Sequence, residues 1–402
     1  MTIQISSSSE VIGSIDDFLQ QILLRLPVKS LMRFKLVSNK WKSLITSTCF
    51  SIQYNSGPNP AVGMLYHGRI IYALEYIHLN DEHPTSSPFK ELKFPEEPYP
   101  FWIHHSCNGL LLCCSTGNFD LVCRYFMSPI RRCYVYNPTT NCFTKLARPG
   151  VANGVPRVVR GVTLAFDVAK SPPYKVVCVR GSEFAPDLSQ IEIYSTESGE
   201  WRESGEPFDA KVDFGKGVYW NGSVHWIRND AREVLFFDVD QERFGNMPLP
   251  DDLPNGLRLR NVEYFGESYD HLHLVQRYDR GMKLIVYEMK RDMPHWFAKY
   301  QVDLTAFVSK IYKDWFAFPE RTSFERYTSR VSNNFKILLL VRGKEGAFLV
   351  MKILRTLVKF DLECRTFEVI CEFRGDDGIR HPSRAFEYIE SLRMFSVPTS
   401  CG

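Results

Sequence analysis

Cysteine and histidine side chains gather in one part of the sequence, and their spacing decides whether they could bind a metal. Six of the 11 cysteines lie within 36 residues, directly after His104 and His105. These six are Cys107, Cys113, Cys114, Cys123, Cys133 and Cys142. Zinc-binding cysteines usually come in pairs about two to four residues apart, and none of these has that spacing. We therefore expect no metal site and interpret the thiols as small buried apolar groups.

Sequence motifs of the common catalytic sites are also missing. The chain contains no G-x-S-x-G, no phosphate-binding P-loop and no H-E-x-x-H. Trp220, Trp226 and Trp296 lie in strand-like patterns, and we expect them in a core rather than around a ligand. The residues that could do chemistry therefore predict a non-enzymatic binding protein without a cofactor.

The clearest helical pattern of the chain covers residues 14–50. Ser14 is suited to cap a first helix, which Pro27 ends. One face of this helix carries apolar residues at steps of three and four, namely Ile15, Phe18, Leu19, Ile22, Leu23 and Leu26. A second and a third helix are predicted to follow, and Ser38 or Asn39 caps the third.

These three helices carry more apolar side chains than so small an element can bury by itself. Fewer than about 40 residues rarely form a stable core without disulfides, a metal or a partner. The stretch has one cysteine, Cys49, and no histidine, so it cannot be stabilised by a disulfide or metal of its own. We therefore predict that the helices dock on another protein.

The helical stretch also resembles a known family. The run L-x-x-I-L-x-R-L-P-V-K-S-L-x-R-F-K-x-V-S-x-x-W-x-S-L-I, which begins at Leu19, is similar to the F-box of plant F-box proteins. The resemblance implies an F-box at residues 13–50 that binds a Skp-family adaptor, and through it a cullin–RING (SCF) ubiquitin ligase. Its adaptor-binding residues would be Phe18, Leu19, Ile22, Leu23, Leu26, Pro27, Leu31, Phe34, Val37, Trp41 and Leu44. Family members usually begin with Leu-Pro, where this chain has Gly13-Ser14-Ile15.

The net charge of +3 comes entirely from this stretch. Residues 1–50 hold three acidic and six basic residues, whereas the rest of the chain has 43 of each sign. The six basic residues are Arg25, Lys29, Arg33, Lys35, Lys40 and Lys42. Such a cluster predicts an acidic partner surface or a phosphate backbone. The cations alternate with apolar residues instead of gathering on one recognition helix, which argues against nucleic acid as the partner.

A β pattern repeats through the remainder of the chain. Five segments place an aromatic residue near the end of an apolar strand and a second one after a polar turn. The two aromatics are seven residues apart in Tyr136/Phe143, Tyr194/Trp201, Phe237/Phe244 and Phe360/Phe367. In the fifth segment Tyr287 and Trp296 are nine apart, which predicts two extra residues in the turn. Successive segments lie 43 to 73 residues apart, a period typical of propeller blades.

Further strand-like runs precede each of these hairpins. Asn221-Gly222 lies between two aromatic-rich arms and predicts a tight hairpin. Ala61–His67 and Arg69–Leu79 form either another unit or part of the blade that closes the ring. We predict about six four-stranded blades, with five or seven left as alternatives.

This region resembles the F-box-associated, kelch-like domain of plant F-box proteins. The motifs that carry the resemblance are SCNGLLLC, YVYNPTT, LAFDVAKSPPYKVVCV, GVYWNGSVHWI, LFFDVDQERFGNMPLP and FEYIESL. Unlike true kelch repeats, the chain has no Gly-Gly dipeptide. The expected fold class is α+β multidomain, in which a small three-helix F-box precedes an all-β, kelch-like propeller at residues 61–398.

The flanking segments and the composition complete the expected organisation. Residues 1–12 read as a disordered tail, and residues 51–60 as a linker rich in turn formers. The sequence shows neither a secretory signal pattern nor an apolar run long enough to span a bilayer. With an odd number of cysteines, we expect reduced thiols in the cytoplasm and/or nucleus, away from membranes.

The two resemblances together imply the substrate-recognition subunit of an SCF ubiquitin ligase. The propeller loops would bind a target protein, and the candidate loops are residues 147–160, 181–190 and 310–330. Arg148, Arg157 and Arg160 could grip an acidic or phosphorylated motif of an unidentified target. The alternatives are an F-box scaffold outside the ligase and a nucleic-acid-binding module that uses the basic helices.

Overall fold

The computed structural model describes most of the 402 residues. The described ranges are 17–54, 60–67, 74–79, 101–116, 130–152, 154–167, 174–185, 187–228, 233–250, 262–278, 282–316, 335–343, 346–373, 384–392 and 400–401. The predicted tail, the Gly13-Ser14-Ile15 start, Cys123 and residues 317–330 of the third candidate loop lie outside them.

The N-terminal part is helical, as predicted. Residues 17–23 form the described part of the first helix. The helices that follow are α2 (Val28–Phe34), α3 (Asn39–Thr46) and α4 (Thr48–Tyr54). Ser38 caps α3, because its hydroxyl accepts a hydrogen bond from the Trp41 backbone amide at 3.1 Å. Helix α4 was not predicted, and it extends four residues into the expected linker.

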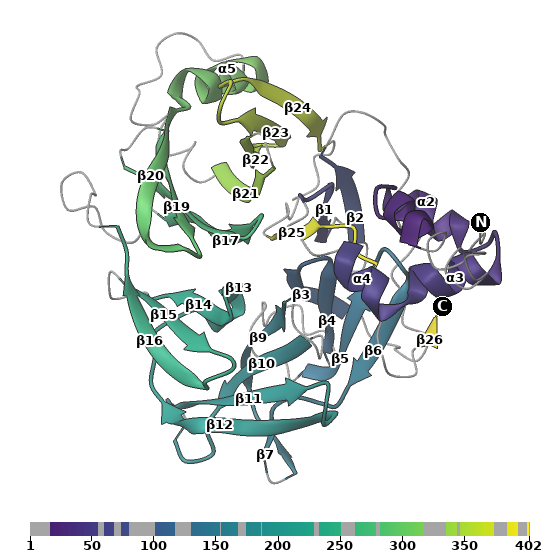
Figure 1. Cartoon of the computed structure of the whole chain (residues 1–402). Helices are drawn as coiled ribbons and strands as arrows, with labels where there is room; N and C mark the ends of the chain where they lie inside the picture. The colour runs from purple at the N-terminus through teal and green to yellow at the C-terminus, as the bar shows by residue number, and fades with distance from the viewer. Residues whose placement is uncertain are drawn as a thin grey trace, which may run out of the picture.

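The remainder of the chain forms antiparallel sheets arranged as a six-bladed propeller (Figure 1). Four blades have four strands each: β9 (Val159–Phe166), β10 (Tyr174–Gly181), β11 (Ser189–Ser195), β12 (Glu200–Phe208); β13 (Val218–Trp220), β14 (Ser223–Ile227), β15 (Glu233–Asp238), β16 (Arg243–Pro248); β17 (Val262–Ser268), β18 (His271–Arg277), β19 (Lys283–Lys290), β20 (Met293–Asp303); β21 (Phe335–Arg342), β22 (Ala347–Ile353), β23 (Thr356–Asp361), β24 (Phe367–Glu372). A fifth blade contains β3 (Phe101–Cys107), β4 (Leu110–Thr116), β5 (Ile130–Asn137) and β6 (Cys142–Leu146), with β26 (Ser400–Cys401) paired to its edge. The prediction of about six blades is confirmed.

The sixth blade joins the two ends of the propeller. It contains β1 (Gly63–His67), β2 (Leu74–His78) and β25 (Ala385–Tyr388), and Leu65 lies opposite Phe386 in the β1–β25 ladder. The early strand pair therefore belongs to the closing blade, one of the two predicted arrangements. The inner strands β25, β3, β9, β13, β17 and β21 follow one another around the axis of the ring (Figure 1).

The repeated aromatic pairs are direct partners across the two outer strands of a blade. Tyr136 lies opposite Phe143, Tyr194 opposite Trp201, Phe237 opposite Phe244, and Phe360 opposite Phe367. The segment with the longer spacing differs from the prediction, because Lys290 pairs with Met293 across a two-residue turn. The extra residues lie within the strands, where they cause shifts in the pairing register. Tyr287 consequently pairs with Ala298 instead of Trp296.

Backbone conformation explains the predicted hairpin at Asn221-Gly222 and a second Asn-Gly turn that was not predicted. Asn221 and Gly222 both have positive φ angles, 47° and 80°, and join β13 to β14. Asn108 and Gly109 do the same between β3 and β4, with φ angles of 47° and 84°. Consecutive positive φ values match the twist of a two-residue hairpin and favour Asn-Gly there.

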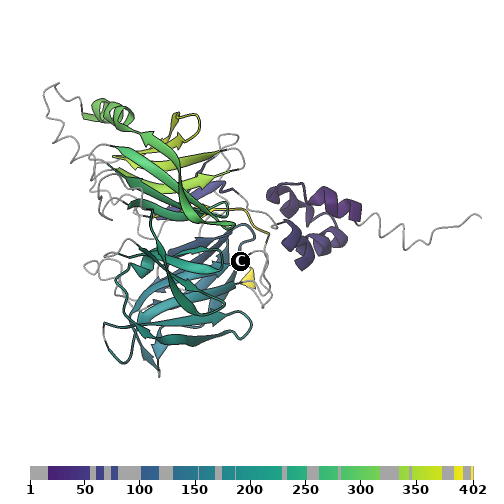
Figure 2. The same ribbon diagram turned by 60° about the vertical axis from the view of Figure 1, so that its left-hand side comes forward.

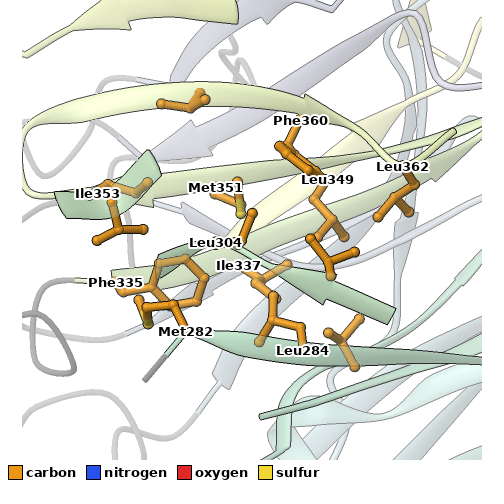
Figure 3. Close-up of a cluster of buried hydrophobic side chains, with 14 of the residues drawn as sticks. Met282, Leu284, Leu304, Phe335, Ile337, Leu349, Met351, Ile353, Phe360 and Leu362 are labelled. Atoms are coloured by element: carbon orange, nitrogen blue, oxygen red, sulfur yellow. The ribbon is translucent and has the colours of Figure 1, made fainter. Parts of the chain in front are cut away.

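Apolar side chains fill the spaces between neighbouring blades. The largest such cluster joins the blade of β17–β20 to that of β21–β24 (Figure 3). In it Leu284 and Ile337 come from different blades, and Leu304, after β20, is also fully buried. Each blade is therefore a sheet with two buried faces, which explains why its central strands read as nearly continuous apolar runs.

A short helix covers the outside of this cluster. Helix α5 (Thr305–Phe316) follows β20 and includes the first part of the segment that was predicted as a third target-binding loop. Val308 and Ile311 of this helix are buried in the cluster, and the Phe307 ring lies 3.9 Å from that of Phe367. Residues 310–316 are thus helical, which corrects the prediction of a loop there.

The alternating strand directions define two faces of the ring. The turns between first and second strands, and between third and fourth strands, lie at one end, the turn face. The links from second to third strands, and from each blade to the next, lie at the other end, the connection face. The helical element enters β1, the second strand of its blade, from the turn face. Figure 2 shows these helices on one side of the ring and α5 on the other.

Candidate functional site

The helical element presents exposed apolar side chains that its own core does not cover. Phe18 is 67% exposed, Ile22 is 47% exposed and Val37 is 62% exposed. Exposed groups of this size on a small helical element are typical of a protein–protein interface. Leu36, which was not among the predicted contact residues, is 88% exposed. We call Phe18, Ile22, Leu36 and Val37 the apolar docking surface.

Two of the predicted contact residues are buried instead of exposed. Leu23 and Leu31 are completely buried and form the core of the helical element with Val28, Ile45 and Phe50. Their side chains therefore stabilise the helices and cannot reach a partner in this structure. The helical periodicity shows only that these residues share an apolar face. It cannot show which of them are buried, because the later helices α2, α3 and α4 cover only part of that face.

The other predicted contact residues lie between these extremes. Pro27 is exposed at the start of α2. Five more are half-buried against the helical core and keep part of their surface accessible: Leu19, Leu26, Phe34, Trp41 and Leu44. The Phe34 and Trp41 rings pack edge to face, with centroids 5.1 Å apart. These residues can contribute the rim of an interface centred on the docking surface.

The C-terminal segment completes the core of the helical element. Leu392, only 1% exposed, packs with Leu23 and the other buried residues of the helices. Burial, and then the nearby Glu390 carboxylate, raise the pKa of Tyr54 in α4 to about 12. Residues far apart in sequence therefore share one core, and the sequence carried no local signal for this contact.

The same segment is bonded to the turn face of the propeller. The Ser391 backbone amide donates to the Thr139 hydroxyl at 3.1 Å, and the Asn137 side chain donates to the Ser391 carbonyl at 3.1 Å. Asn137 and Thr139 belong to β5 and the turn that follows it. This turn lies in YVYNPTT, and Ser391 and Leu392 end FEYIESL, so two of the resembling motifs meet here. The helices are thus attached to the ring through both ends of the propeller.

The three arginines predicted to bind a target are engaged within the propeller. Arg148 Nε donates to the Ile130 carbonyl at 3.1 Å, and Arg157 faces Glu183 at 4.0 Å. Arg160 Nη1 donates to the Ser189 hydroxyl at 2.7 Å and to a neighbouring carbonyl. All three join the 147–160 segment to adjacent strands and loops.

A buried ion pair also holds the 147–160 segment in place. Arg180 Nε lies 2.5 Å from Glu192 Oε1, and the two side chains are 1% and 5% exposed. The second oxygen of Glu192 accepts the Gly150 amide at 2.9 Å. Arg180 also contacts Glu203 on β12. This network satisfies the buried charges and holds the 147–160 segment against β11.

An apolar patch lies on the connection face beside these arginines. Val151, Val155 and Val158 are 38%, 52% and 46% exposed, and Phe184, in the loop between β10 and β11, is 77% exposed. The Gly181 amide donates to the Val158 carbonyl at 2.9 Å, so the two loops are neighbours. Two of the predicted target-binding loops therefore form one surface, although its exposed groups are mainly apolar.

Five cysteines of the cluster noted in the sequence lie in the propeller core. Cys107, Cys113, Cys114, Cys133 and Cys142 are buried, and burial raises the pKa of the Cys107 and Cys113 thiols. Within the described ranges, no three histidine, cysteine or acidic side chains are grouped so that they could hold a metal ion. None of the described helices is long and apolar enough to cross a membrane. Neutral buried thiols suit packing and are poor nucleophiles.

Comparison with known proteins agrees with both parts of this architecture. The F-box domain family matches residues 16–53, and the F-box associated beta propeller domain family matches residues 64–267. The F-box protein At5g07610 of Arabidopsis thaliana is 32% identical over 96% of this chain and 94% of its own length. The F-box protein At5g49610 of the same plant is 28% identical over 67% of this chain and 73% of its own length.

The fold and the helical docking surface define a modular recognition protein. The chain belongs to the F-box proteins that carry an F-box associated β-propeller domain. This combination indicates a role in substrate recognition. The kelch-like description of the blades stays a prediction.

Proposed function

We propose that this protein is the substrate-recognition subunit of an SCF ubiquitin ligase. Its F-box docks on a Skp-family adaptor, which links it to the cullin–RING subunits, and its propeller binds a target protein. The observation that carries this proposal is the apolar docking surface on an F-box whose own core is already filled. Burying those side chains on an adaptor would stabilise the complex by roughly 25 cal/mol for each Å² of apolar surface removed from water.

In the proposed mechanism this chain brings the target close to the ubiquitin donor and supplies no catalytic group itself. A target held on the propeller is tethered near an activated ubiquitin, so its lysines meet a high effective concentration of the donor. The attachment of the F-box through Leu392 and Ser391 supports this role, because a fixed orientation limits the volume that the tethered target explores. The connection face, opposite the helices, is the proposed target side. We place this activity in the cytoplasm and/or nucleus, where buried thiols such as Cys113 stay reduced.

Adaptor binding by the full chain tests the proposal. We expect Ile22→Asp to lower the affinity for a purified Skp-family adaptor at least about tenfold, since it buries an unpaired charge in the interface. Val369→Asp is the matched control, because Val369 on β24 is also 47% exposed but lies on the propeller. The proposal fails if the wild-type chain binds no Skp-family adaptor, or if both variants bind equally well.

A further inference from the structure

Cationic side chains from three separate segments meet at the axis of the ring, on the connection face. Lys336 is the second residue of the inner strand β21, and Arg384 directly precedes the inner strand β25. Lys216 ends the short helix η1 (Phe214–Lys216), which leads into β13. All three positions are at the start of inner strands, and this end of the ring faces away from the F-box (Figure 2).

Contacts between these segments show that they converge. The Arg384 guanidinium donates through Nη2 to the Gly215 carbonyl of η1, although their blades are on opposite sides of the ring. Helix η1 packs against β9 so closely that a Cβ on Gly161 would lie 2.1 Å from the Phe214 oxygen. Desolvation, and then the charges of Lys216 and Arg384, lower the pKa of Lys336.

A fourth cation, on the neighbouring strand β22, adds positive charge next to this cluster. Lys352 lies directly opposite Lys336 in the β21–β22 ladder, and its residue surface is only 9% exposed. Like charges in a direct cross-strand pair are destabilising. Desolvation, and then Lys336, lower the pKa of Lys352 to about 8. An anion bound between the two lysines would offset their mutual repulsion, so this pair favours anion binding.

Two described carboxylates lie near the cluster, and each is paired with a cation. Asp213 lies 3.1 Å from Lys216, and Glu263 lies 2.8 Å from Arg277. Among the described residues at this end of the axis, five cations therefore face two carboxylates. They are Lys216, Arg277, Lys336, Lys352 and Arg384.

We propose that Lys336, Lys352, Arg384 and Lys216 form a binding site for a phosphate monoester, carried by a phosphorylated side chain of the target protein. A phosphoryl group carries about −1.5 to −2 charges near neutral pH and three acceptor oxygens, which suits a guanidinium beside several ammonium groups. The bond to Gly215 uses one of the five N–H donors of Arg384. The inference rests on the proposed function as a target receptor and names the feature of the target that the propeller reads.

Thermal unfolding of the full chain with O-phosphoserine, at constant ionic strength and pH 7.5, tests the site. The wild type should gain several degrees in Tm as O-phosphoserine is added, because a ligand of the native state stabilises it by mass action. Glutamate at the same concentrations should give a much smaller shift. Equal shifts with both compounds, or no shift with either, would overturn the proposal.

Variants assign the effect to the cluster. Lys336→Met and Lys352→Met should each abolish the shift while matching or exceeding the wild-type Tm without ligand, since each relieves the like-charged pair. Lys145→Met, an exposed lysine on the outer strand β6, should keep the shift. Retention of the shift in both cluster variants would contradict the assignment. Adaptor binding is measured on the same proteins, so a failure of this site remains distinct from a failure of the ligase proposal.

Discussion

Trp201 lies directly opposite Tyr194 across β11 and β12, with the ring centroids 5.4 Å apart. The Trp201 indole also donates to the Ala147 carbonyl at 2.9 Å, at the end of the preceding blade. Trp296 makes the corresponding bond to the Pro248 carbonyl at 3.1 Å, two blades further on. One side chain therefore stabilises the hairpin of its own blade and joins that blade to its neighbour.

Substitution of Trp201 separates these two contributions. We expect Trp201→Phe to lower the free energy of unfolding by about 1 kcal/mol, since it keeps a ring against Tyr194 but removes the N–H donor. Trp201→Ala should lower it by at least about 1 kcal/mol more, because the ring contact is lost as well. Urea denaturation followed by tryptophan fluorescence measures both. Equal stability of Trp201→Phe and the wild type would show that the bond to Ala147 contributes nothing.

The buried Arg180–Glu192 pair predicts strongly non-additive effects. Arg180→Met should destabilise the protein by about 3–5 kcal/mol, since the Glu192 carboxylate stays buried without its cationic partner. Glu192→Gln should cost less, since Arg180 keeps its contact with Glu203. The double variant should lose less than the sum of the single losses. Chemical denaturation of the four proteins gives this cycle. Additive losses would mean that the two charges do not interact in the native state.

His225 predicts a loss of stability in mild acid. Desolvation lowers the pKa of this buried imidazole from its ordinary value of 6.5 to about 4. Between these values the unfolded chain binds more protons than the native one, so stability is complete above pH 6.5 and falls as the pH decreases toward 4. The loss amounts to at most about 1.4 kcal/mol per pH unit.

A difference measurement isolates this contribution. Burial raises the pKa of Glu267 from 4.5 to about 7, which works in the opposite direction across the same pH range. His225→Phe suits the aromatic surroundings, because the Trp220 and Phe236 ring centroids each lie 5.8 Å from the imidazole. The stability of wild type minus that of His225→Phe should therefore decrease from pH 6.5 to pH 4.5, since Glu267 cancels. A difference that is constant with pH would contradict the assignment to His225.

Leu392 predicts that the F-box depends on the end of the chain. A chain that stops after Tyr388 should show faster hydrogen exchange in residues 17–54 and weaker adaptor binding than one that stops after Leu392. Both lack β26, so the comparison isolates the segment that fills the helical core. Leu392→Ala should destabilise the helices by about 2–5 kcal/mol, as expected for a buried leucine. Identical exchange in the two shortened chains would show that the helices hold together by themselves.

The blade repeat could be predicted from the sequence because it reflects local geometry. Across a four-residue turn, residues seven apart become direct cross-strand partners, as Tyr136 and Phe143 do. Asn221-Gly222 was equally informative, since few residue pairs adopt two consecutive positive φ values. The segment of Tyr287 was predicted less well, because a spacing of nine does not say whether the extra residues enter the turn or the strands.

The docking surfaces were predicted only in part, because burial depends on contacts across the whole chain. Ile22 and Leu23 are neighbours in one apolar pattern, yet Ile22 is 47% exposed and Leu23 is fully buried. The partner that closes this core, Leu392, comes from the other end of the sequence. Lys336 and Arg384 likewise show no relationship in sequence, and only ring closure brings them near the same axis.

Closure of the ring between β1 and β25 has a consequence for synthesis. While the chain is still emerging from the ribosome, β1 has no inner strand to pair with, and the F-box lacks the leucine that fills its core. Both are supplied by the same short segment, residues 385–392, which is made after β1 to β24. A chain that stops before residue 385 therefore has neither a closed propeller nor a filled F-box core, so both parts of the molecule depend on synthesis of this one segment.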